Sequence, residues 1–274
     1  YIMNFRTPLF FNYKFLKVSV FIFVILSVFT CDNIFEYSVY DADVKESQKN
    51  TTSKNLIEVK TKEQNTSNNF KFAVISDTHF YYDDLRAIID DINSRPEILF
   101  VIVTGDFTQQ GLLKEYELFY EIIEMLSKPY LTVIGNHDYL SNGENIYNTM
   151  FGENNYTFEF KNNKFIFFDN IVWESNKIPD FKWLANELDD SISYNIFVFA
   201  HIPPRDEQFT DSMRNSYRSI LEENNAKLSI HGHAHSYDFR IVNNIEYLTV
   251  STVNKDSYCI INVDGSSYSI DLIE

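Results

Sequence analysis

The sequence predicts an α/β domain over residues 70–274, and three observations support this class. Strand-like apolar runs alternate with segments whose apolar residues recur at helical spacing, which is the pattern of βαβ units. Several of these runs are almost continuously apolar, as expected for parallel strands that are covered on both faces. Hydrophobic residues make up 45% of the 274 residues. A chain of this size and composition can bury its core without disulfides or structural metals.

The first 31 residues are predicted to be a signal peptide. An uncharged run of 13 residues, 18–30, follows Lys14 and Lys17. A membrane-spanning helix needs ~20 apolar residues, so the run better fits the hydrophobic region of a signal peptide. It stops at Cys31, which resembles the precursor of a bacterial lipoprotein, in which this cysteine is lipidated.

This segment therefore predicts an exported protein that Cys31 anchors to the membrane on the extracytoplasmic side. Lipoproteins usually carry small residues where Phe29 and Thr30 stand, so an uncleaved signal anchor and ordinary cleavage nearby are alternatives. Fatty-acid labelling and cell fractionation of the wild type and of Cys31→Ser distinguish lipidation from plain secretion.

Residues 32–69 are predicted to be a disordered linker. Asn, Thr, Ser, Lys and Glu are frequent here, and no helical or strand period is sustained over a useful length. A flexible coil of this length would hold the following domain on the order of 35 Å from its anchor.

The domain begins with three predicted strands, at 70–76, 98–103 and 130–134. Two helices separate them, over residues 85–92 and about 114–126. Cys259 lies in an apolar run, where a lone cysteine is expected to be buried and free. Further strands are predicted at 156–160, 164–168, 195–200, 227–231, 245–250 and 258–263, and further helices at about 180–190 and 212–223.

Polar motifs directly follow or end five of these strands. In α/β sheets, sites form beyond the carboxyl ends of the strands, so we expect the motifs to meet in one site. Five of the six histidines fall in them; the sixth, His231, is predicted to pack at a strand end, with support of a ligand as the alternative. In order, the motifs are Asp77-Thr78-His79, Gly105-Asp106, Gly135-Asn136-His137-Asp138, His201 and Gly232-His233-Ala234-His235.

The order of these motifs resembles that of the calcineurin-like metallophosphoesterases, over roughly residues 70–252. The resemblance implies a four-layer α/β/β/α sandwich and two metal ions bridged by Asp106. His137 would act as the acid at the leaving group, and Asp138 would orient His137 and raise its pKa. The implied ligands are Asp77, His79, Asp106 and His235 for one ion, and Asp106, Asn136, His201 and His233 for the other.

The ligand set predicts two divalent ions of the Mn, Fe, Zn or Co class, because Ca prefers all-oxygen shells. In an extended segment, Asp77 and His79 would point the same way and hold one ion. The ions bring four positive charges against the two negative charges of Asp77 and Asp106. The surplus suits a phosphate ester and a hydroxide that bridges the ions and attacks the phosphorus.

Departures from related subfamilies favour the branch that resembles cyclic nucleotide phosphodiesterases. Gln109 stands where purple acid phosphatases carry a Tyr, and the third motif ends in Asp138, where Ser/Thr protein phosphatases have Glu. The second motif reads Gly105-Asp106-Phe107-Thr108, a form similar to that branch.

The net charge argues against nucleic acid and favours a small phosphomonoester or phosphodiester. The chain carries −16, and residues 1–31 contribute three bases and no acid, so the rest carries 39 acids against 20 bases, or −19. Arg205, in the loop after His201, is predicted to bind a phosphate oxygen, with a solvated charge as the alternative. A non-catalytic scaffold, a binding lipoprotein and a nuclease are the alternative functions.

Overall fold

A five-stranded sheet carries the first three strands of the domain. In the computed structural model, which describes residues 38, 40–189 and 195–274, β1 pairs in parallel with β2, and β2 with β3. On the other side of β1, β10 and β11 are antiparallel, which gives the order β11-β10-β1-β2-β3. The bounds are Asn69–Ile75 (β1), Ile98–Val103 (β2), Tyr130–Thr132 (β3), Tyr258–Asp264 (β10) and Ser267–Ile273 (β11).

A six-stranded sheet contains the remaining strands, in the order β4-β5-β6-β7-β9-β8. Its four middle strands are parallel, and an antiparallel strand lies at each edge. The bounds are Tyr156–Phe160 (β4), Asn163–Phe167 (β5), Ile196–Phe199 (β6), Leu228–His231 (β7), Asp238–Val242 (β8) and Ile245–Thr249 (β9).

The two sheets face each other across a core of aromatic side chains. Phe72 of β1 stacks on Phe100 of β2, with ring centroids 5.3 Å apart, and meets Phe165 of β5 edge-on at 5.4 Å. Successive strand residues point to opposite faces, so Ala73 belongs to the separate core that the helices cover.

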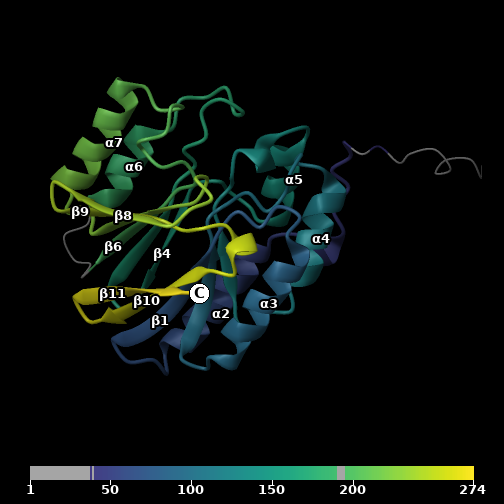
Figure 1. Cartoon of the computed structure of the whole chain (residues 1–274), viewed down its shortest axis with the longest axis horizontal. Coiled ribbons are helices and arrows are strands. Elements are labelled where there is room, and N and C mark those ends of the chain that lie inside the picture. The colour runs from purple at the N-terminus through teal and green to yellow at the C-terminus, as the bar shows by residue number, and fades with distance from the viewer. Residues whose placement is uncertain (1–37, 39, 190–194) are drawn as a thin grey trace, which may run out of the picture. The chain divides into compact units, whose positions relative to one another are not determined.

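Helices cover the outer faces of both sheets (Figure 1). The first sheet is covered by α3 (Tyr82–Ser94), α4 (Leu113–Ile123) and α5 (Gly143–Met150), and the second by α6 (Phe181–Leu188) and α7 (Asp211–Glu223). The predicted four-layer α/β/β/α sandwich is confirmed. Two short 3-10 helices, η2 (His137–Tyr139) and η3 (Val253–Lys255), follow β3 and β9.

The prediction of a disordered linker over 32–69 is wrong for much of its length. Residues 46–48 form the 3-10 helix η1, and α2 spans Thr51–Glu63 and contacts β2, β3 and β4. Val59 of α2 is 1% exposed in the core between the sheets. The helix was missed because it is mostly polar, with an apolar face too narrow to give a sustained period. The folded unit of residues 39–274 therefore begins well before residue 70.

Three further elements were not predicted: α5 and the edge strands β8 and β11. The side chains of β8 are partly or fully exposed, and those of β11 alternate between exposed and half-buried. An edge strand with few buried positions does not give a clear apolar signal, so only its pairing identifies it.

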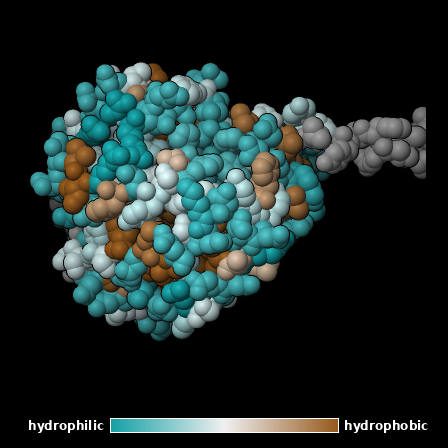
Figure 2. All heavy atoms as spheres, viewed as in Figure 1, coloured by the Kyte–Doolittle hydropathy of each residue, from teal (hydrophilic) through white to brown (hydrophobic). Residues whose placement is uncertain are grey.

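The predicted signal peptide and Cys31 lie outside the described residues and stay predictions. Among the described helices, none has both the length and the apolar character that a membrane crossing requires. Cys259 is buried as expected, and burial raises the pKa of its thiol to about 12. The face in Figure 2 is mostly hydrophilic, with its hydrophobic residues in small separate groups.

Candidate metal centre

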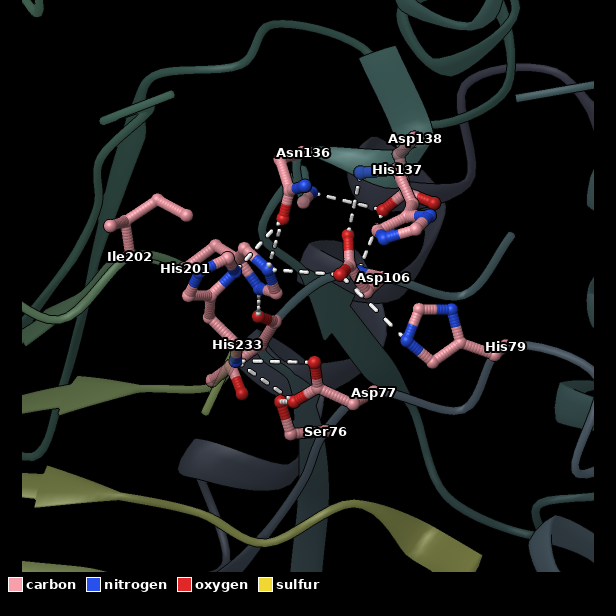
Figure 3. Close-up of polar contacts among 12 residues, drawn as sticks. Ser76, Asp77, His79, Asp106, Asn136, His137, Asp138, His201, Ile202 and His233 are labelled. Atoms are coloured by element: carbon pink, nitrogen blue, oxygen red, sulfur yellow. Dashed lines mark hydrogen bonds and ion pairs between the residues drawn. The ribbon is translucent and has the colours of Figure 1, made fainter. Parts of the chain in front are cut away.

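The five motifs meet at one end of the sandwich, where the carboxyl ends of strands from both sheets lie together (Figure 3). Residues after β1, β2 and β3 come from the first sheet, and residues after β6 and β7 come from the second. The expectation that the motifs form a single site is therefore met, because parallel strands of both sheets end at this edge.

A first group of donor atoms consists of Asp77, His79, Asp106 and His235, with one atom from each within 4.8 Å of all the others. Nε2 of His235 lies 3.3 Å from Oδ1 of Asp77 and 3.3 Å from Nε2 of His79. Nε2 of His79 lies 3.8 Å from Oδ2 of Asp106.

A second group shares Asp106 and adds His201 and His233. Nε2 of His201 lies 3.2 Å from Oδ2 of Asp106. Asn136 completes this group, because its Oδ1 lies 3.1 Å from Nε2 of His201 and 3.0 Å from Nδ1 of His233. The structure thus brings all seven predicted ligands together, with Asp106 between the two groups, and their role as ligands stays a prediction.

The orientation of the histidines fits metal ions at both groups. A metal-binding histidine usually anchors its second ring nitrogen on a carbonyl or carboxylate. Nδ1 of His79 donates to the carbonyl of Thr108 at 3.1 Å, and Nδ1 of His201 donates to that of Thr104 at 2.7 Å. Nε2 of His233 lies 3.3 Å from a carboxylate oxygen of Asp206. In each ring the other nitrogen, which would be the metal donor, faces the cluster.

The charges of the cluster also call for cations. Asp77 and Asp106 are 0% and 1% exposed, and a buried carboxylate needs a compensating charge. Burial raises the pKa of Asp106, but the charge and hydrogen bond of His201, together with the charges of His137 and His79, outweigh burial and hold this pKa well below its usual range. Conversely, burial lowers the pKa of His201, and Asp106 raises it to about 10.

Five of the seven predicted ligands have backbone φ angles in the left-handed region, from 39° at His79 to 67° at His233. The others are Asp77, Asp106 and His235. The prediction that Asp77 and His79 hold an ion from an extended segment is therefore wrong in its geometry, because β1 ends at Ile75. Non-glycine residues adopt this conformation at a cost of about 1–3 kcal/mol each, typically at functional sites.

Gly105 allows the two sheets' loops to approach each other beside Asp106. Its φ is +97°, and a Cβ at this position would lie 2.6 Å from Nδ1 of His201 and 2.8 Å from Cα of Gly135. Only glycine fits both the angle and the space. The glycine of the second motif thus has a steric role in assembling the cluster.

The predicted role of Asp138 is wrong. Among the described residues, its carboxylate makes no hydrogen bond or ion pair with the ring of His137, but accepts four hydrogen bonds from the loops that carry Asp106 and Asn136. Oδ2 accepts from the amides of Asp106 (2.8 Å) and Gly135 (2.9 Å), and Oδ1 accepts from the amide (2.9 Å) and hydroxyl (2.8 Å) of Thr108. Burial raises the pKa of Asp138 to about 7, with a further increase from Asp106 that these bonds partly offset. Asp138 thus joins the two loops.

His137 lies beside the cluster, and a main-chain carbonyl orients it. Its Nδ1 donates to the carbonyl of Gln109 at 2.8 Å, which leaves Nε2 as its free ring nitrogen. Its ring centroid lies 4.9 Å from that of His79. The side chain is only partly buried, as a group that meets a substrate must be.

Two acidic residues that the sequence did not identify support the cluster. Oε1 of Glu174 accepts from Nδ2 of Asn136 at 3.0 Å, which turns the amide oxygen of Asn136 toward His201 and His233. Asp206 lies beside His233, as described above. Neither residue belongs to one of the five motifs. Only the position of Asp206 in the loop after His201 could have indicated from the sequence that it lies near the cluster.

Arg205 is not placed against the cluster. Its Nη1 lies 2.9 Å from Oδ2 of Asp238, and it lines a separate pocket with His231. His231 is fully buried at the end of β7, as predicted, and its Nε2 lies 2.7 Å from Oγ of Ser229. Burial lowers the pKa of His231 to about 3.

Comparisons with known proteins identify a matching family model, two curated relatives and a solved structure of the same fold. The family model of the calcineurin-like phosphoesterases matches residues 70–237. A probable glycerophosphodiester phosphodiesterase of Arcobacter nitrofigilis is 27% identical over 184 residues, which cover 60% of this chain and 66% of that protein, just under two thirds of its length. A probable cyclic nucleotide phosphodiesterase of Xenorhabdus bovienii is 27% identical over 179 residues, 57% of this chain and 69% of that protein. The crystal structure of a dimetal phosphatase from Danio rerio has the same fold, with a TM-score of 0.58 at 12% identity over 74% of this chain and 95% of that one.

Proposed function

The chain belongs to the calcineurin-like phosphoesterase family, and from this membership we propose that it hydrolyses small phosphodiesters with two divalent metal ions. The observation that carries the proposal is the convergence of two donor groups on the shared carboxylate of Asp106. Carboxylate, imidazole and amide oxygen donors suit Mn, Fe, Zn or Co. Two bound ions would supply an activated water and stabilise the negative charge of the phosphoryl group.

Some of the clustered residues would bind the two ions, and His137 would donate a proton. Asp77, His79 and His235 would hold one ion, and Asn136, His201 and His233 the other, with Asp106 between them. Glu174 fixes the amide of Asn136, and Asp138 fixes the two loops. His137 is held by the carbonyl of Gln109 so that Nε2 can give a proton to the oxygen of the leaving alcohol.

A small diester is favoured over nucleic acid by charge and by similarity. The chain carries −16, and long nucleic acids are normally bound by clustered Lys and Arg. The two curated relatives described above are named as phosphodiesterases of small substrates. These observations support a small diester as the substrate.

Turnover of model substrates tests this proposal. We expect the protein loaded with Mn, Fe, Zn or Co to hydrolyse bis(p-nitrophenyl) phosphate, and to prefer it by kcat/KM to an oligonucleotide at both low and moderate salt. Turnover should stop when a chelator removes the metal. A preference for the oligonucleotide by an order of magnitude would indicate a nuclease. Bound metal without any turnover would indicate a scaffold or a binding protein.

His137→Ala tests the role of His137 as the acid. We expect kcat for an alkyl ester to fall by roughly 10²–10⁴-fold, because the leaving alkoxide then receives no proton. The metal content should not change, because His137 is not a proposed ligand. The loss should be much smaller for p-nitrophenyl esters, whose leaving group needs no proton. Equal losses for both esters would contradict the acid role.

A further inference from the structure

A separate pocket lies between the loop after His201, helix α7 and strands β7, β8 and β9. Its volume is about 80 Å³. A cavity that admits one water needs roughly 10–15 Å³ by the same measure, so this pocket has room for a small polyatomic group. We call it the arginine pocket, because Arg205, Arg218 and Arg240 all line it.

The arginine pocket is positively charged in a strongly acidic chain. Asp238 is its acidic lining residue, and its Oδ2 lies 2.9 Å from Nη1 of Arg205 and 2.8 Å from Nε of Arg240. Three guanidinium groups against one carboxylate leave a formal charge of +2. Arg218 makes no hydrogen bond or ion pair with any residue in the part of the chain that the structure describes.

Buried polar atoms without partners gather at the same place. Nε of Arg218, Oη of Tyr247 and Nδ1 of His231 have no hydrogen-bond partner among the described residues. Tyr247 is 8% exposed and His231 is fully buried. A buried donor without a partner costs about 1–3 kcal/mol, so a bound group that accepts from Arg218 and Tyr247 would stabilise this pocket.

The hydrogen bonds that join Tyr217, Ser229 and His231 are consistent with a proton on Nδ1 of His231. Oγ of Ser229 lies 2.7 Å from Nε2 of His231 and 2.8 Å from Oη of Tyr217. When Tyr217 donates to Ser229, and Ser229 to Nε2, the proton of the neutral imidazole lies on Nδ1. The pocket then presents a hydroxyl, a ring N–H and the unpaired guanidinium.

We propose that the arginine pocket binds an oxyanion group, a phosphate or a carboxylate. Guanidinium groups bind such groups through charge-assisted and often bidentate hydrogen bonds. Tyr247 and His231 would complete the shell, and Pro203 and Pro204 line the pocket with apolar surface. The anion is either a free ion or a second anionic group on a substrate whose ester lies at the metal centre. The loop from Pro203 to Asp206 contacts both sites.

Calorimetric titration of inorganic phosphate into the metal-loaded full chain tests the proposal. Phosphate is also expected to bind at the metals, so the informative quantity is the number of sites that a variant loses. Arg218→Gln should lose one phosphate site per chain, or weaken it on the order of 10-fold or more, the value of a hydrogen bond to a charged group. Arg86→Gln, a change of an exposed arginine on α3, is the matched control and should lose none.

Tyr247→Phe provides a second test of the same site in case Arg218→Gln does not fold. Removing a buried hydroxyl that has no partner should not destabilise the fold, yet it should weaken phosphate binding roughly 3–10-fold. Equal phosphate binding in the wild type and in both variants would overturn the proposal. Absence of bound metal or of turnover in the wild type would count against the proposed function instead, because the arginine pocket contains none of the proposed ligands.

The KM values of two substrates identify the source of the anion. One substrate is bis(p-nitrophenyl) phosphate, and the other is a diester that carries an additional phosphate. If Tyr247→Phe raises KM for the second substrate alone, the pocket binds part of the substrate. If it weakens phosphate binding without changing either KM, the pocket binds a separate anion. Both results support an oxyanion site.

Discussion

Asp106→Asn is expected to abolish phosphoester turnover and to lower the metal content of the purified protein. Asp106 is the residue that the two donor groups share. Its Oδ2 lies within 3.8 Å of Nε2 of both His79 and His201, while its Oδ1 accepts from the amide of His137 at 2.9 Å. An amide at this position removes the negative charge that the two donor groups share and presents an N–H group toward the ions.

We expect kcat to fall on the order of 10³-fold or more, at least the loss that follows removal of one preorganised charge-stabilising group. Metal analysis gives the number of ions per chain, and Asp83→Asn, the same change on an exposed part of α3, is the control. Two ions per chain together with normal turnover would show that Asp106 does not bridge the ions.

Asp138→Ala and Asp138→Asn are both expected to destabilise the protein and to reduce its metal content. In the alanine variant, the amides of Asp106, Thr108 and Gly135 and the hydroxyl of Thr108 lose their acceptor. In the asparagine variant, one carboxylate oxygen becomes an NH₂ group that faces two donors. We expect a loss of about 3–5 kcal/mol in the free energy of unfolding, as when a buried charged partner is removed.

Urea unfolding and metal analysis of the same preparations measure both effects. If Asp138 instead oriented His137, both variants would fold and bind metal normally, and would lose activity mainly on esters with poor leaving groups, as His137→Ala does. Normal stability and metal content in Asp138→Asn would therefore contradict the structural role and restore the role that the sequence predicted.

The strand and helix pattern predicted an α/β domain with a single site, and the resemblance to the family implied the four-layer sandwich and the seven ligands. Each motif follows its own apolar strand, and parallel strands end at a common edge of the sheet. Assigning the strands was therefore enough to predict that the motifs meet in one site. The same reasoning failed for the backbone of Asp77 and His79, because the chain leaves β1 in a left-handed conformation that a strand pattern does not encode.

The partners of these residues were decided only by the tertiary structure. Asp138 bonds to Thr108, 30 residues away, and Asn136 bonds to Glu174, 38 residues away. Val59 reaches the core between the sheets from a helix that is polar over most of its surface. Arg218, Tyr247 and His231 come from α7, β9 and β7 to line one pocket. Hydrogen bonding and packing depend on distances in space, so residues without a motif acquired their roles only when the two sheets brought distant segments together.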